Sequence, residues 1–92
     1  MEEIIQIKKA LLSLKVVPHL TKFVEKYEMC IKNMRSMKDV MRNPDFKHDI
    51  QNLSIFAGEK RKKLCSDIRD KKSWVTADKI NYNASRVIIS KF

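Results

Sequence analysis

The sequence predicts an all-α fold, a single domain made of a small bundle of four to five helices. Three observations lead to this expectation. Apolar residues recur at three- and four-residue steps through most of the chain, which is the period of an amphipathic helix. The 92 residues include only one glycine and two prolines, too few for strands joined by tight turns. A hydrophobic content of 43% is sufficient for one small core.

The first helix is expected within the opening 14 residues. Its apolar stripe is Ile4, Ile7, Leu11 and Leu14, and Ile5 and Leu12 widen it. Pro18 interrupts the pattern, so residues 15–17 are expected to form a short turn.

A second helix is predicted from about residue 19 to the mid-thirties, and it has the clearest pattern in the chain. Its apolar positions are Leu20, Phe23, Val24, Tyr27, Ile31, Met34, Met37 and Met41. Glu28 lies four residues before Lys32, an orientation that stabilises a helix slightly. Pro44 marks the next boundary.

A third helix is predicted to begin after a cap at Asn43 or Asp45. Its apolar positions are Phe46, Ile50, Leu53, Ala57, Leu64 and Ile68. Gly58 either lies inside this helix, at a cost of about 1 kcal/mol relative to alanine, or ends it. The pattern leaves both alternatives open.

The last segment is predicted to be a short helix. Ile80, Ala84, Val87 and Ile88 have helical spacing, although residues 86–90 also have strand propensity. Trp74 and Val75 are expected to anchor this segment on the core. We therefore divide the chain into a helical bundle, residues 1–72, and a C-terminal extension, residues 73–92, that packs on the bundle or on a partner.

The chain is strongly basic. Twenty Lys and Arg against 11 Asp and Glu give a net charge of +9. Such a surface attracts nucleic acid, an anionic membrane or an acidic protein segment, or it simply keeps the domain soluble. Seven basic and three acidic side chains give residues 59–72 a charge of +4, whereas ten and seven give residues 1–58 a charge of +3.

Four consecutive cations form the most basic run, Lys60, Arg61, Lys62 and Lys63. Such a run binds a nuclear import receptor, heparin-like polyanions or a phosphate backbone. The alternative is a solvated helix surface, because four consecutive residues spread around most of a helix.

The residues that carry catalytic or metal chemistry are few. His19, His48, Cys30 and Cys65 do not have the spacing of a zinc site, and the two thiols are expected to be buried in a reducing compartment. No glycine-rich loop is present to hold a phosphate or an oxyanion. We therefore expect no enzyme, no catalytic residue, no metal, no cofactor, no small-molecule substrate and no membrane partner. The expected location is intracellular and nuclear.

Two short motifs resemble a known family. Residues 13–16 (SLKV) and 30–38 (CIKNMRSMK) are similar to a turn and a helix end of the TFIIS N-terminal domain superfamily. Within it, the chain is most similar to the integrase-binding domain of lens-epithelium-derived growth factor and its relatives. The resemblance covers about residues 3–65, and Ile50, Leu53, Ala57, Lys62 and Leu64 follow the spacing of the last helix of that fold.

The chain also departs from the family pattern. Arg61 stands where many members have a tryptophan, and Met37 replaces the loop aromatic residue. The loop over residues 38–49 is longer than usual, and the first helix of the integrase-binding domain has no counterpart.

The resemblance implies a right-handed helical bundle that scaffolds transcription-elongation complexes. Domains of this family bind disordered segments in which acidic residues flank an apolar or aromatic anchor, and the contact loop carries over to Met37, Lys38 and Val40. We therefore expect a partner-binding site with an apolar floor and a charged surround. The floor would be Met37, Val40 and Met41, and the surround Arg35, Lys38 and Lys47. Val40→Glu and Lys38→Glu are expected to weaken binding and leave the helical content intact.

Two further functions remain open from sequence. Residues 60–72 would serve a non-specific nucleic-acid-binding module, with a steep dependence of affinity on salt. Alternatively, the segment 74–92 would complete a second copy of the chain in a self-associating structural module.

Overall fold

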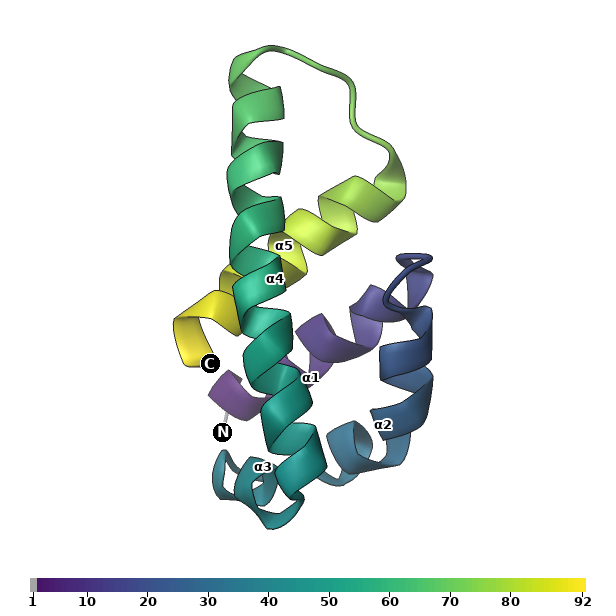
Figure 1. Cartoon of the computed structure of the whole chain (residues 1–92), viewed down its shortest axis with the longest axis vertical. Helices are drawn as coiled ribbons and strands as arrows, with labels where there is room; N and C mark the ends of the chain where they lie inside the picture. The colour runs from purple at the N-terminus through teal and green to yellow at the C-terminus, as the bar shows by residue number, and fades with distance from the viewer. Residues whose placement is uncertain (1) are drawn as a thin grey trace.

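The computed structural model describes residues 2–92, and in that range it contains five α-helices, one short 3₁₀ helix and no strand. The elements are α1 (Glu2–Ser13), the 3₁₀ helix η1 (Leu14–Val16), α2 (Thr21–Asn33), α3 (Lys38–Arg42), α4 (Pro44–Arg69) and α5 (Thr76–Lys91) (Figure 1). The prediction of a small all-α bundle of four to five helices is confirmed.

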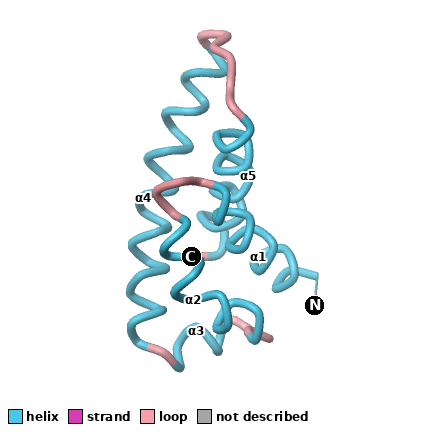
Figure 2. Tube along the Cα trace, turned by 90° about the vertical axis from the view of Figure 1, so that its right-hand side faces the viewer, coloured by secondary structure: helices cyan, strands magenta, loops and turns pink. Residues whose placement is uncertain are grey.

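The long helix α4 organises the molecule. Its 26 residues extend for about 39 Å at the usual helical rise, close to the longest dimension of the molecule, 42 Å. α5 crosses α4 and packs against both α4 and α1, and α3 packs against α4. Figure 2 shows α4 along one side of the molecule, with α1 and α5 beside it.

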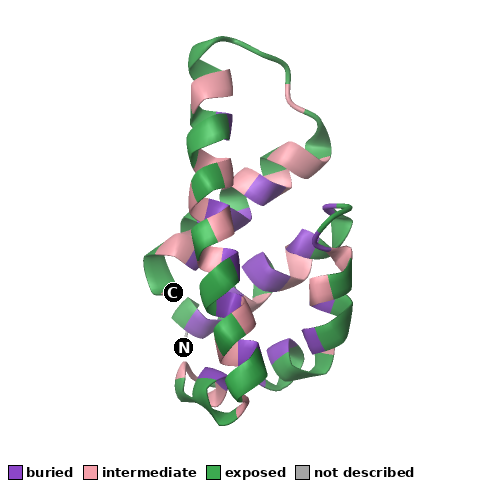
Figure 3. Cartoon of the chain, viewed as in Figure 1, coloured by how far each residue is buried: buried purple, intermediate pink, exposed green. Residues whose placement is uncertain are grey.

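The core lies where α1, α2, α4 and α5 meet (Figure 3). The predicted stripe of the first helix is buried, and it consists of Ile4, Ile7, Leu11 and Leu14. Leu12 packs against this core from its edge. Ile5 is 51% exposed, so its inclusion in the stripe was wrong. It follows Ile4 by one residue, and this step of about 100° turns its side chain toward solvent.

The predicted second helix is shorter than its apolar pattern. α2 ends at Asn33, because Met34 has an extended backbone (φ −66°, ψ 122°) that turns the chain away. Met34 is still buried and so completes the stripe. Met37 and Met41 belong instead to the loop and to the separate helix α3, and Met41 is 60% exposed. The inclusion of Met41 in the stripe of α2 was therefore wrong.

The start of α4 has a well-formed cap. The side-chain oxygen Oδ1 of Asn43 accepts hydrogen bonds from the backbone N–H of Asp45 (3.1 Å) and of Phe46 (3.2 Å). Pro44 occupies the first helical position, where the missing N–H has no intrahelical partner to lose. Of the two predicted caps, Asn43 is therefore the one used.

α4 continues through Gly58 for another 11 residues to Arg69, which answers the question that the sequence left open. Phe46, Ile50, Leu53, Ala57 and Leu64 are buried along it as predicted. Ile68 is 51% exposed, so its assignment to the buried stripe was wrong. The last turns of α4 extend beyond α1 and α2, which leaves few side chains to cover them (Figure 1).

α5 is a helix over its whole length, including the part with strand propensity. Its buried side chains include the small Ala84 and Ser85, which allow close approach to neighbouring helices. The buried Ser85 hydroxyl donates to the backbone carbonyl of Asn81 at 2.6 Å, so burial leaves it satisfied. Trp74 packs on Tyr82, with ring centroids 5.3 Å apart, but Val75 is 64% exposed and anchors nothing.

A polar contact ties α2 to α4. The buried Tyr27 donates its hydroxyl hydrogen to the carboxylate of Asp49, and the ammonium of Lys26 lies 3.7 Å from the same carboxylate. The Asp49 carboxylate as acceptor, together with burial, raises the pKa of Tyr27 above its ordinary value. The Tyr27 ring lies 5.0 Å from that of Phe46, so the contact joins polar and aromatic packing.

Glycine at position 58 lowers the stability of α4, and its packing within residues 2–92 does not require a residue without a side chain. A Cβ at this position would have no atom within 4 Å. We predict that Gly58→Ala raises the free energy of unfolding by about 1 kcal/mol, because glycine loses more backbone entropy than alanine in a helix. Urea denaturation followed by circular dichroism measures this change. Lys62→Gly, one turn further along and exposed, is the matched control and is expected to lower stability by a similar amount. A Gly58→Ala variant no more stable than the parent would contradict the explanation.

Candidate functional site

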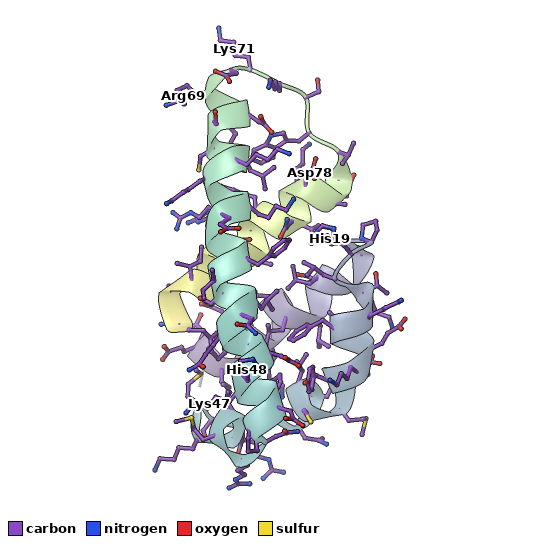
Figure 4. The ribbon with its side chains drawn as sticks, viewed as in Figure 1. His19, Lys47, His48, Arg69, Lys71 and Asp78 are labelled. Atoms are coloured by element: carbon purple, nitrogen blue, oxygen red, sulfur yellow. The ribbon has the colours of Figure 1, made fainter. Side chains whose placement is uncertain are left out.

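The end of the bundle that carries α3 contains a hollow of about 470 Å³. We call it the α3 hollow. Its lining residues are Met37, Lys38, Val40, Met41, Lys47, Ile50, Gln51, Lys91 and Phe92. They come from α3 and the loop before it, from the first turns of α4 and from the end of α5. Figure 4 shows Lys47 on the part of α4 beside α3.

The hollow has an apolar floor and a positive rim. Five of its side chains are large and apolar, namely Met37, Val40, Met41, Ile50 and Phe92. Lys38, Lys47 and Lys91 add three ammonium groups, and among residues 2–92 no Asp or Glu side chain lines the hollow. Lys91 pairs with Glu3, whereas Lys38 and Lys47 form no ion pair with any of residues 2–92. The two free lysines are therefore available to an acidic ligand.

The short helix α3 depends on its neighbours for its position. Five residues are too few to form a stable helix alone. Val40 is only 4% exposed and inserts into the core, which leaves the next residue, Met41, facing solvent. Asp39 lies in the first turn of α3, and its carboxylate accepts hydrogen bonds from the backbone N–H of two residues in the preceding loop, Arg35 (2.6 Å) and Ser36 (3.1 Å).

These contacts change the titration of Asp39. The hydrogen bond from the Arg35 backbone, followed by that from Ser36, holds the pKa of the Asp39 carboxyl below its ordinary value of 3.8. The guanidinium of Arg42, 3.3 Å away, acts in the same direction. The ionised carboxylate therefore stabilises the loop that leads into α3.

The structure brings five of the six predicted partner-binding residues together around the α3 hollow: Met37, Lys38, Val40, Met41 and Lys47. Arg35 does not line this hollow. It lines a different hollow of about 540 Å³, which it shares with Asp39 and Arg42.

Sequence reasoning missed four residues of the hollow. Ile50 was assigned to the core alone, and Gln51 had no signal of its own. Lys91 and Phe92 come from the far end of the chain, and only the packing of α5 brings them to α3. No local pattern predicts such a contact.

The burial of Val40 changes one expected test. A glutamate at this position would place a charge in the core and destabilise the fold, because an unpaired buried charge is costly. Given this burial, we now expect Val40→Glu to lower the helical content as well as binding. Met41, on the exposed side of the same helix, is the suitable position.

A second hollow, of about 400 Å³, lies where α4 passes the end of α5. We call it the α4 groove. Its lining residues are Gly58, Arg61, Lys62, Cys65, Ser66, Arg69 and Ile89. The predicted run of four cations therefore divides, and only Arg61 and Lys62 reach this groove. The ammonium of Lys60 lies over the Phe56 ring, 5.5 Å from its centroid, and Lys63 is exposed outside the groove.

The cysteines do not behave as the sequence predicted. Cys30 and Cys65 are both free and exposed, so the expectation of buried thiols was wrong. Each occurs in a helix, but on its solvent-facing side and not on its apolar stripe. Within residues 2–92, no group of three or more His, Cys, Asp or Glu side chains is arranged to hold a metal ion. No helix in the same range is both long and apolar enough to cross a membrane.

Comparison with protein-family models, with curated proteins and with solved structures finds no match to this chain.

The depressed pKa of Asp39 predicts how stability varies with pH. The folded-state pKa is below the ordinary value, so the stabilisation is complete above pH 3.8 and is lost as the pH falls through the folded-state pKa. We predict that Asp39→Asn is less stable than the parent at neutral pH. Asparagine resembles the protonated acid, so the difference is expected to shrink toward zero in acid. Urea denaturation at neutral pH and well below pH 3.8 measures it, and an equal difference at both would contradict the assignment.

Proposed function

We propose that this chain is a protein-interaction domain that binds acidic disordered segments through an apolar or aromatic anchor seated in the α3 hollow. The observation that carries the proposal is the composition of the hollow, a floor of Met37, Met41 and Phe92 over the buried Val40 and Ile50, beneath a rim that includes two lysines with no ion pair among residues 2–92. No catalytic role is part of the proposal.

The floor suits an anchoring side chain. Its volume of about 470 Å³ falls in the range of binding pockets, and burying a phenylalanine there would contribute about 1.5–3 kcal/mol. Met37 and Met41 have flexible thioether side chains that adapt to the shape of an aromatic ring. Met41, 60% exposed in the free chain, would become covered in the complex.

The rim suits flanking acidic residues. Lys38 lies on α3 and Lys47 on α4, so acidic residues that flank an anchor would find a lysine on each of two helices at the hollow. Exposed ion pairs of this kind add little affinity, but they steer the encounter and orient the segment. The anchor would therefore provide most of the affinity, and the lysines most of the selectivity for acidic segments.

The resemblance to the TFIIS N-terminal domain superfamily points to the same loop, at Met37, Lys38 and Val40. A role in transcription or chromatin complexes and a nuclear location form part of the proposal on that ground. Acidic segments with a single apolar anchor are the kind of ligand that this resemblance implies.

The test is a titration of a fluorescent peptide that contains one phenylalanine among aspartates and glutamates. We predict that Met41→Glu weakens binding by about tenfold or more. The glutamate would repel the acidic peptide from the floor of the hollow, and the apolar contact of Met41 would be lost. Lys47→Glu is expected to weaken binding by a smaller factor and to reduce its dependence on salt. Fluorescence anisotropy at two salt concentrations measures both effects.

Met29→Glu is the matched control for the floor. Met29 is 67% exposed on α2 and does not line the hollow, so the same chemical change there is expected to leave affinity nearly unchanged. A peptide with alanine in place of phenylalanine tests the anchor. Equal losses in Met41→Glu and Met29→Glu, or no loss with the alanine peptide, would show that the hollow is not the binding site.

A further inference from the structure

The α4 groove differs in chemistry from the α3 hollow. Arg61, Lys62 and Arg69 supply three cations, and Ser66 adds a hydroxyl between them. Lys62, Ser66 and Arg69 follow four- and three-residue steps along one side of α4, and Arg61, one residue before Lys62, lies about 100° around the helix from it. Arg61 and Arg69 are eight residues apart, about 12 Å along the helix axis. The groove therefore presents a row of three positive charges within an arc of about 100° on α4.

The three cations are not neutralised by the chain itself. Within residues 2–92, none of Arg61, Lys62 and Arg69 pairs with a carboxylate. The one polar side-chain contact of Arg69 is a 3.5 Å hydrogen bond from its Nη2 to the Ser66 hydroxyl. Glu59, Asp67 and Asp70, the acidic residues nearest in sequence, do not line the groove. The row is thus free to bind an external anion.

The floor of the groove is open and contains no aromatic ring. Gly58 leaves empty space above the helix backbone, because an added Cβ would have no atom within 4 Å. Cys65 and Ile89 provide the rest of the floor. Proteins that bind single-stranded nucleic acid stack its bases on aromatic side chains, and this groove has none to offer. It also lacks the large apolar floor that would hold the anchor of an acidic peptide.

The groove is also sterically accessible. The C-terminal turns of α4 extend beyond α1 and α2, so these two helices do not cover them (Figure 1). Figure 4 shows Arg69 and Lys71 at this free end. Lys71 has a left-handed backbone (φ 58°) at the position after the helix cap, where glycine would be less strained. A lysine there costs some stability and places another cation at the end of the row.

From these features we propose that the α4 groove binds the phosphate backbone of double-stranded nucleic acid, with Arg61, Lys62 and Arg69 each contacting one phosphate. The guanidinium groups bind phosphate oxygens through paired N–H donors, and the lysine acts as a point charge. Contacts of this type carry no base sequence information, so binding is independent of sequence. This site is separate from the α3 hollow and does not depend on the function proposed for it.

The test is the salt dependence of binding to a short labelled DNA duplex of arbitrary sequence, measured by fluorescence anisotropy. Three phosphate contacts predict that log K falls with log salt concentration with a slope of about −2.7. Lys62→Gln is expected to reduce the magnitude of this slope by about 0.9, and the double variant Arg61→Gln/Arg69→Gln by about 1.8. Circular dichroism confirms that each variant is folded.

The matched control removes two charges elsewhere. Lys9→Gln/Lys22→Gln alters exposed residues of α1 and α2 and is expected to leave the slope nearly unchanged. Met41→Glu is also expected to bind the duplex like the parent, so failure of the α3 hollow would not affect this result. Equal changes in the two double variants would show that only the net charge of the chain matters and would overturn the proposal. Equal binding of the single strand, or full competition by polyglutamate of equal charge, would also overturn it.

Discussion

The packing of α5 against α4 and α1 is the contact on which the other features depend. Ile88, fully buried at this crossing, contributes about 1.5–3 kcal/mol, and the small Ala84 and Ser85 let the helices approach closely. The crossing also directs the end of α5. It brings Ile89 to the α4 groove and Phe92 to the α3 hollow, so both candidate surfaces are completed by α5-end residues at least 20 positions away from the α3 and α4 residues that line them.

α4 then separates the two surfaces. Lys47 lines the α3 hollow and Lys62 lines the α4 groove, and the 15 residues between them correspond to about 22 Å along the axis. This distance exceeds the Debye length of about 8 Å at physiological ionic strength, so the charges of one surface act only weakly on a ligand at the other. One helix thus presents an apolar hollow with a lysine rim and a polar groove with a row of cations, and the two proposed ligands would bind independently.

Much of this fold is predictable from local sequence, because periodicity and capping are local. The buried stripe of α1 and the cap at Asn43 are of this kind. The continuity of α4 through Gly58 could not be predicted in this way. Glycine disfavours a helix by only about 1 kcal/mol, and the burial of Leu64 in the next part of the helix offsets that cost. The contiguous part of the α3 hollow could be predicted, whereas Phe92 could not, because its place depends on how α5 crosses α4. The exposure of Cys30 was missed because free cysteine is among the most often buried residue types, and this tendency outweighed its position beside the stripe.

The most direct test of the central claim is a heteronuclear NMR titration of the full chain with the acidic phenylalanine peptide, observing backbone amides and methionine methyl groups together. The account predicts the largest shifts at the methyl groups of Met37 and Met41 and at the amides of Lys38 and Lys47. It also predicts that the same shifts appear when the chain is already saturated with a DNA duplex. Shifts concentrated between Arg61 and Arg69, or loss of peptide binding in the presence of the duplex, would show that the chain has a single polyanion site and no apolar anchor pocket.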